Sequence, residues 1–142
     1  MSLPRILTMA VAGAAVWLLP APASAHHAFA AEFDANKEVS LRGVVAKIEM
    51  INPHSWIHVD VKKKDGTVER WMIEAGPPGA LVRRGWKKDS VPIGTEVLVE
   101  GYQAKDGTNK ANGREITLPN GERLFMGASG TGAPYDAAAP KK

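Results

Sequence analysis

Imidazole is the side chain best suited to binding transition metals and to transferring protons near neutral pH, and this chain holds its four histidines in two places. His26 and His27 are adjacent, and His54 and His58 lie together in residues 52–61. The sequence contains no cysteine, which excludes thiol catalysis, disulfide exchange and thiolate metal ligation. Any metal chemistry of this protein is therefore expected to depend on the imidazoles.

The first pair of histidines follows a segment typical of an export signal. Arg5 is followed by an almost uncharged apolar run over residues 6–19, and residues 23–25 read Ala-Ser-Ala, which fits the small-x-small cleavage pattern. The run is short for a membrane anchor, which needs about 20 apolar residues. We expect residues 1–25 to be a signal peptide that only engages the export machinery, with cleavage after Ala25 releasing a soluble periplasmic protein.

Cleavage after Ala25 would give His26 a free α-amine next to its own imidazole. An amine and an imidazole on one residue form a chelate, and a further nitrogen nearby suits Cu(II), which prefers a tetragonal nitrogen set. His27 could supply that nitrogen. The alternative is that the two histidines simply lie in solvent near a cleavage site.

The second pair cannot bind one ion on a straight strand. His54 and His58 are four residues apart, which corresponds to about 13 Å along a strand, whereas a metal–imidazole bond measures about 2 Å. His54 becomes useful if the turn at Asn52 and Pro53 directs it toward the N-terminal arm. The alternatives are a turn-stabilising role for His54 and an exposed strand position for His58.

Two further groups could form a surface for a ligand or partner. Trp56 projects beside His58, although we expect Phe29 and Phe33 of the N-terminal arm to cover it. A basic run with one aromatic residue could bind an anionic group, or it could be a solvated helix end with its tryptophan packed under the domain. The candidate residues of this run are Arg83, Arg84 and Trp86.

The hydrophobic pattern predicts a mainly β fold. Alternating apolar residues mark the strands, and turn signals such as Asp65-Gly66 separate them. The order indicates a small OB-like Greek-key barrel of five to six antiparallel strands, with one short helix between the third and fourth strands. The predicted strands cover residues 38–51, 55–63, 67–75, 95–104, 110–118 and 122–126, and the helix covers residues 78–84.

Local details of this pattern can be predicted as well. The apolar phase of the first strand slips around Gly43, which indicates a bulge or sharp bend. In the predicted helix, Leu81 and Val82 are expected to face inward, and Gly85 is expected to supply the left-handed cap.

The length and the net charge of the chain predict its domain organisation and limit its partners. With 142 residues, the chain is expected to form one domain, with an arm at 26–37, the barrel at 38–126 and a disordered tail at 127–142. The formal net charge of +3 is too even to indicate a nucleic-acid partner.

Several motifs resemble an uncharacterised family of small exported bacterial proteins, a domain-of-unknown-function family. The resemblance covers residues 26–127 and implies a periplasmic location and a single small β domain, but it supplies no activity and no established functional residues. Members usually begin His-His-Ser-Phe, so Ala28 departs from that pattern. The matching segments are residues 26–34 (HHAFAAEFD), 52–57 (NPHSWI), 81–86 (LVRRGW), 99–102 (VEGY) and 104–107 (AKDG).

These observations favour a periplasmic, non-enzymatic binding module. Our hypothesis is that His26, with His54 and His27, binds a copper-like divalent ion. One alternative is a protein or glycan interaction module of the cell envelope that holds no metal. Another is a copper oxidase or monooxygenase centred on the N-terminal histidine. No catalytic residue can be assigned from the sequence.

Overall fold

The computed structural model describes residues 28–127 and 133–134. The predicted signal peptide, His26 and His27 lie outside the described residues. No helix in these two ranges is long and apolar enough to span a bilayer. The elements are α1 (Ala28–Glu32), β1 (Phe33–Glu49), β2 (Ser55–Lys62), β3 (Val68–Ala75), α2 (Pro78–Arg83), β4 (Glu96–Ala104), β5 (Lys110–Thr117) and β6 (Arg123–Phe125).

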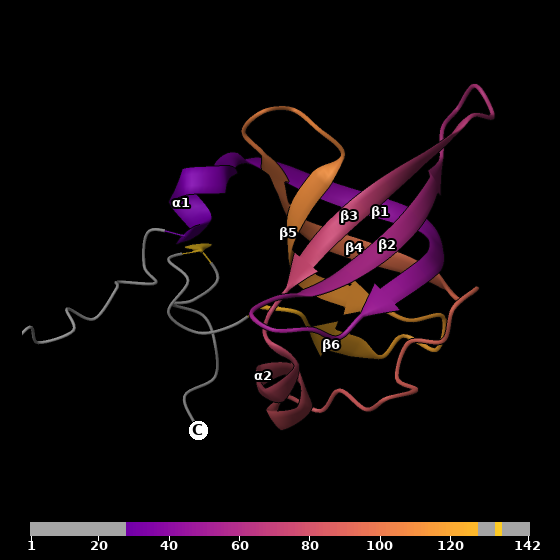
Figure 1. Cartoon of the computed structure of the whole chain (residues 1–142). Helices are drawn as coiled ribbons and strands as arrows, with labels where there is room; N and C mark the ends of the chain where they lie inside the picture. Colours follow the sequence, from indigo (N-terminus) through magenta and orange to yellow (C-terminus); the bar gives the residue numbers. More distant parts are fainter. Residues whose placement is uncertain (1–27, 128–132, 135–142) are drawn as a thin grey trace, which may run out of the picture.

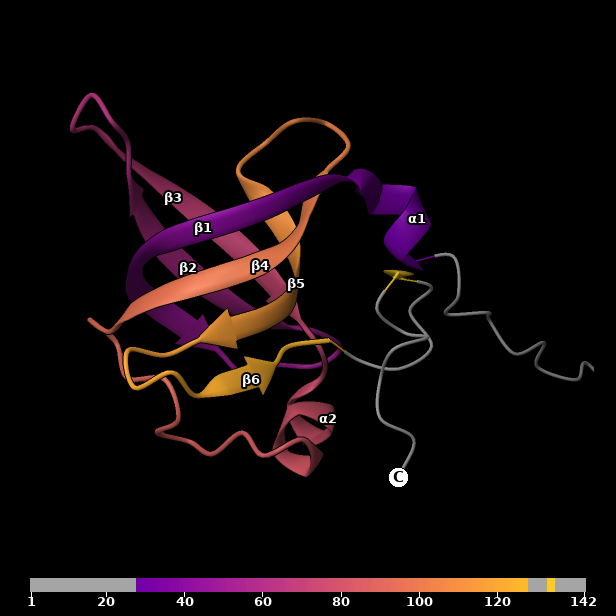
Figure 2. The same ribbon diagram turned by 180° about the vertical axis from the view of Figure 1, so that it is seen from behind.

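Five of these strands close into a ring. The sheet runs β3-β2-β1-β4-β5-β6, and an additional pairing joins β3 to β5, so that each strand of the ring has two neighbours (Figure 1). The closing β3–β5 pair is parallel, whereas the other strand pairs are antiparallel. The ring and the position of α2 between β3 and β4 confirm the predicted OB-like Greek-key arrangement. Figure 2 shows the short β6 continuing the sheet beyond β5.

The first strand belongs to two pairings at once. Its first half pairs with β4 and its second half with β2, and Val44 takes part in both ladders. Gly43 is buried at this bend, and a Cβ placed on it would lie 2.5 Å from the backbone oxygen of Asp60. A bulge follows between Val45 and Lys47. The predicted irregularity is therefore a close approach at Gly43 followed by a bulge at Ala46.

The N-terminal half of β1 is longer than the sequence pattern indicates. It begins at Phe33, which pairs with Ala104 of β4, and the register shifts before Glu38 resumes the ladder with Tyr102. The pairs that Phe33 and Glu38 form with β4 thus hold the two ends of this extension in the sheet, although the residues between them have no strand alternation in their sequence. A one-turn helix, α1, precedes this extension.

The hairpin formed by β2 and β3 has the predicted faces. Ile57 and Val59 are completely buried, whereas Trp56 and His58 point to the other side of β2. Trp71 and Ile73 of β3 also point into the core. The Asn52–Pro53 peptide bond in the turn before β2 is cis.

The helix α2 covers one end of the ring, where β3 ends (Figure 1). Leu81 is completely buried, which contributes about 1.5–3 kcal/mol of hydrophobic stabilisation. The prediction that Val82 also faces inward is wrong, because the helix is only six residues long and Val82 projects from its solvent side, 59% exposed. Gly85 ends the helix in the predicted left-handed conformation, with φ at 100°.

The core fills the ring, and a second cluster lies outside it. The second cluster includes Ala133, which belongs to the segment predicted to be a disordered tail; residues 128–132 and 135–142 of that tail lie outside the described residues. The members of the main core are Leu41, Val45, Ile57, Val59, Trp71, Ile73, Ala75, Leu81, Trp86, Val91, Val97, Val99, Ala111, Ile116, Leu124 and Met126.

We predict that Gly43→Ala destabilises the fold by about 1–3 kcal/mol, because overpacking a close backbone contact forces the strands apart. Gly79→Ala is the matched control. A Cβ at Gly79 would meet only the Arg83 guanidinium at 3.5 Å, and alanine in a helix is favoured over glycine by about 0.5–1 kcal/mol. Urea unfolding of both variants tests this, and an unchanged midpoint for Gly43→Ala would contradict it.

Candidate functional site

Strands β2, β3 and β5 present a common outer surface that carries both described histidines. On β2, Trp56 and His58 alternate with the buried residues, and their directly opposite partners on β3 are Glu74 and Met72. Strand β5 continues both rows. We refer to this surface as the outer face; its members are His54, Trp56, His58, Met72, Glu74, Lys110 and Asn112.

His54 is held against a buried carboxylate. Its Nδ1 atom lies 3.3 Å from Oε1 of Glu74, and the His54 side chain is 37% exposed whereas that of Glu74 is 11% exposed. The side-chain amide of Asn112 donates to the same oxygen at 3.3 Å. With Nδ1 turned to the carboxylate, Nε2 is the ring nitrogen that a ligand would use. Carboxylates orient metal-binding histidines in this way.

The carboxyl group of Glu74 is electrostatically unusual. Burial raises the pKa of Glu74, and the negative charge of Glu32 adds to this effect, whereas His54 and Asn112 lower the pKa. The interaction with Glu32 brings α1 into the same electrostatic environment, where Lys110 donates a hydrogen bond to Glu32. The end of the outer face at His54 therefore holds a buried carboxyl group whose charged form a nearby cation would stabilise.

His58 forms a second imidazole–carboxylate pair. Its Nε2 atom lies 2.7 Å from Oε2 of Glu49, and Lys47 donates to Oε1 of the same carboxylate at 2.7 Å. These hydrogen bonds lower the pKa of Glu49. The His58 side chain is only 12% exposed, so the expectation of an exposed strand position does not describe it.

The N-terminal arm packs on β4 and not over Trp56. The rings of Phe29 and Tyr102 meet edge to face with centroids 5.5 Å apart, and Phe33 joins the same cluster. The expectation that these phenylalanines cover Trp56 is wrong. The reason is that Phe33 already pairs with Ala104 at the start of β1, which directs the arm to the β4 side of the ring.

The proposed ligand set is only partly within the described residues. His54 is described, but His26 and His27 precede Ala28 and lie outside the described residues. Within residues 28–127 and 133–134, no three His, Asp or Glu side chains gather closely enough to hold a metal ion. A metal site at His54 would therefore need donors from outside the described residues, such as the two histidines that precede Ala28.

The basic run after α2 is largely structural. Trp86 is buried, and its indole N–H donates to the carbonyl oxygen of Phe125 at 2.8 Å, so its ring is not part of the surface. The guanidinium of Arg84 lies 4.4 Å from the centre of the Phe125 ring. Arg83 is exposed on α2. Only the two arginines remain as surface candidates in this segment.

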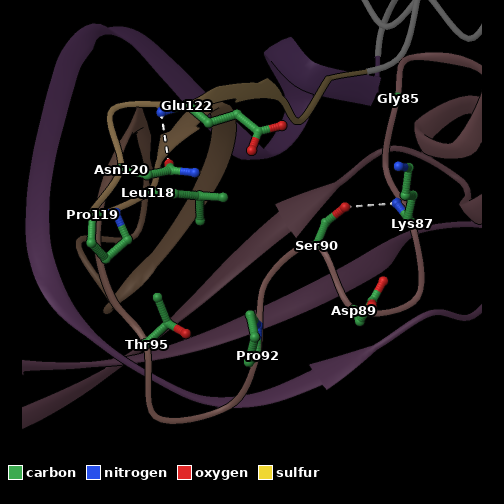
Figure 3. A pocket seen from close by; sticks show the side chains of 10 residues that line it. All are labelled: Gly85, Lys87, Asp89, Ser90, Pro92, Thr95, Leu118, Pro119, Asn120 and Glu122. Carbon is green, nitrogen blue, oxygen red and sulfur yellow. Dashed lines mark hydrogen bonds between the residues drawn. The ribbon is translucent and has the colours of Figure 1, made fainter.

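A cavity of about 530 Å³ lies between the chain after α2 and the β5–β6 turn, and neither described histidine lines it. Figure 3 shows that its polar groups include both charge signs, with Lys87 beside Asp89 on one side and Glu122 on the other. The hydroxyl of Ser90 accepts from the Lys87 backbone, and Asn120 accepts from the Glu122 backbone. These contacts stabilise the turns themselves, and we do not assign a ligand to this cavity.

Sequence reasoning missed three members of the two imidazole environments. Alternation predicts Glu74 and Met72 to be ordinary outward-facing residues of β3, and it places Glu49 within the predicted first strand, residues 38–51. Their importance comes from neighbours on other strands, which no local pattern encodes. The available signal was that His54 and His58 share the strand face of Trp56.

Comparison with protein families matched residues 15–114 to a family of unknown function (DUF6152). Since the match spans well over half of the chain, the chain belongs to this family. No curated protein and no solved structure matched the chain.

We predict that Glu74→Gln stabilises the protein relative to the wild type increasingly as the pH rises. Burial raises the folded-state pKa of Glu74 above its ordinary value of 4.5, so the stability contributed by the protonated carboxyl is full below pH 4.5 and is lost as the pH rises through the folded-state value. Glutamine stays neutral throughout. Unfolding free energies measured from pH 4 to 8 test this trend.

Glu96→Gln is the control for this series, because its side chain is 62% exposed and lies on another part of the ring. The difference between this control and the wild type should not grow with pH. A difference for Glu74→Gln that is equally flat would show that burial does not govern this carboxyl group.

Proposed function

We propose that this member of a family of unknown function is an exported, non-catalytic binding module for a copper-like divalent ion. The ligands are the α-amine and imidazole of His26 together with His54, and His27 is a further donor. The observation that carries the proposal is the fixed His54 ring, whose Nδ1 lies 3.3 Å from the buried carboxylate of Glu74. The location, the ion and the ligand set are all part of the proposal.

The electrostatics at His54 support a cation. Burial raises the pKa of Glu74, and the charge of Glu32 adds to this effect, although Glu32 is itself paired with Lys110. A cation bound near His54 would stabilise the charged form of Glu74. Glu74 would act on the metal through His54, since it holds the imidazole in one orientation and increases its basicity. Such a carboxylate increases metal affinity without being a ligand itself.

The effect of Glu32, at the end of α1, on the pKa of Glu74 supports participation of the N-terminal histidines, although α1 itself packs on β4. Phe29 is buried against Tyr102, and the Glu32 backbone oxygen accepts from the Lys105 backbone N–H at 2.9 Å. The described chain begins at Ala28, immediately after His27.

Nitrogen ligands favour copper among the common divalent ions. Affinity for nitrogen sites rises along the divalent series to Cu(II), which accepts a tetragonal set of amine and imidazole donors. These donors bind only when deprotonated, so binding should release protons and weaken in acid. The proposal therefore concerns Cu(II) rather than a hard ion such as Mg²⁺, which prefers oxygen ligands.

Export with cleavage after Ala25 is the first prediction of this proposal. The intact mass of protein recovered from the periplasm of an expressing bacterium should equal that of residues 26–142, since only this cut exposes the amine of His26. Recovery of a species that begins elsewhere, or of the full chain in the cytoplasm, would contradict it.

The second prediction concerns Cu(II) binding by the correctly cut protein. We expect one Cu(II) per chain in calorimetry, with nitrogen hyperfine coupling in the electron paramagnetic resonance spectrum. His54→Gln should lower the affinity at least tenfold, and Glu74→Gln should lower it by about 10–100-fold because the supporting carboxylate is lost.

The matched control keeps residues 20–25 at the N-terminus, which preserves every side chain of the site and moves the amine away from His26. This form should lose at least tenfold in affinity. If the form that keeps residues 20–25 binds Cu(II) as tightly as the cut protein, the amine of His26 is not a ligand. If His54→Gln binds as tightly as the wild type, the N-terminal arm binds alone and the joint site does not exist.

A further inference from the structure

The outer face places a histidine and a methionine directly opposite each other. His58 of β2 pairs with Met72 of β3. The N–H of Met72 donates to the backbone oxygen of Asn109 at 2.9 Å, so the polar backbone groups of Met72 point away from β2. The His58–Met72 pair is therefore a non-hydrogen-bonded one, in which the α-carbons are about 4.5 Å apart and the side chains are close.

Glu49 determines which nitrogen of His58 can bind a ligand. The Nε2 atom lies 2.7 Å from the Glu49 carboxylate, and a carboxylate accepts hydrogen bonds. The proton of the neutral ring is therefore held on Nε2, and Nδ1 carries the lone pair. The side chain is 12% exposed, so this imidazole is largely shielded from water.

Met72 offers a soft donor next to that imidazole. Its side chain lies on the outer face, with the residue 39% exposed, and its thioether sulfur can bind soft metal ions. Trp56 is the diagonal neighbour of Met72 across the β2–β3 ladder, at about 7–8 Å, a distance that aromatic side chains span. The face of an indole ring attracts a cation.

The charges around this group are balanced. Lys47 is opposite His58 and is paired with Glu49 at 2.7 Å. Lys110 is opposite Met72 and is paired with Glu32. In the next row Asp60 forms an ion pair with Arg70 at 2.8 Å. A site without excess negative charge is better suited to a monovalent ion than to a divalent one.

We propose that His58 and Met72 form a binding site for Cu(I), with Nδ1 and the thioether sulfur as the two donors and the Trp56 ring adjacent to the ion. Nitrogen and thioether donors together select a soft, monovalent ion over Zn²⁺ or Ca²⁺. The ring of His58 is pre-oriented by Glu49, and both strands are fixed by the closure of the ring, so the site needs little reorganisation to bind.

This site is separate from the one proposed for Cu(II). His54 lies in the turn immediately before β2 and His58 lies within β2. Four residues of extended chain span about 13 Å, too far for the two imidazoles to share one ion, and the Cu(I) site uses no residue before 28. It can therefore be tested in the form that keeps residues 20–25, in which the amine of His26 is unavailable. Failure of either proposal leaves the other unaffected.

The test uses Ag(I), a monovalent soft ion that does not change oxidation state. We expect one Ag(I) per chain in calorimetry and quenching of tryptophan fluorescence, since Trp71 and Trp86 are buried and Trp56 lies beside the site. Met72→Leu and His58→Gln should each lower the Ag(I) affinity at least tenfold, and Cu(I) should compete with Ag(I) for the site.

Met50→Leu is the matched control, because Met50 is 41% exposed, compared with 39% for Met72, but lies in the β1–β2 turn. Its affinity for Ag(I) should equal that of the wild type. Bound Ag(I) should also protect Met72, and not Met50, from oxidation by peroxide, which a change in stability alone would not produce.

Two outcomes would overturn the proposal. One is equal Ag(I) affinity for the wild type and Met72→Leu, which would place the ion elsewhere. The other is absence of Ag(I) binding while Met72→Leu lowers only the unfolding free energy. In that case Met72 makes nothing more than a sulfur–aromatic packing contact with Trp56.

Discussion

The parallel pairing of β3 with β5 closes the ring, and the outer face depends on it. This pairing sets Met72 beside Lys110 and Glu74 beside Asn112. Without it β3 would be an edge strand, and Glu74 would project into water as its alternation predicts. Closure instead buries the carboxylate and supplies the Asn112 amide as its hydrogen-bond donor. This contact between residues that are distant in sequence thus creates the environment that raises the pKa of Glu74.

A buried carboxylate on the surface of a small β domain needs an explanation. Removing a charged group from water costs free energy that one imidazole and one amide only partly return. A glutamine at position 74 would keep a hydrogen-bond acceptor for Asn112 at lower cost. Stability therefore does not account for Glu74. Perturbed titratable groups of this kind concentrate at functional sites, where local rules of folding are broken for another purpose.

Most of the fold could be predicted from the sequence because its strands alternate clearly and its turns use glycine. Residues such as Ile57 and Val59 define the inner face of β2, and Gly85 marks the end of α2. The extension of β1 back to Phe33 could not be predicted, since it arises from pairing with β4 and not from its own residues. The same reason applies to Glu74 and Met72, whose roles come from strand neighbours that are distant in sequence. His54 was recognisable from its turn, but its carboxylate partner was not.

The two imidazoles of the outer face differ through the position of their carboxylates. Glu74 is buried and its pKa is raised, while His54 is 37% exposed. At His58 the arrangement is reversed: the imidazole is 12% exposed, and Glu49, 31% exposed, has a lowered pKa that keeps it ionised. A more exposed imidazole supported by a buried carboxylate suits a divalent ion, whereas a covered imidazole with a fixed proton and a thioether neighbour suits a soft monovalent one. The turn before β2 and the strand itself can therefore present two chemically distinct sites, because residues four apart lie on the same face but too far apart to bind one ion.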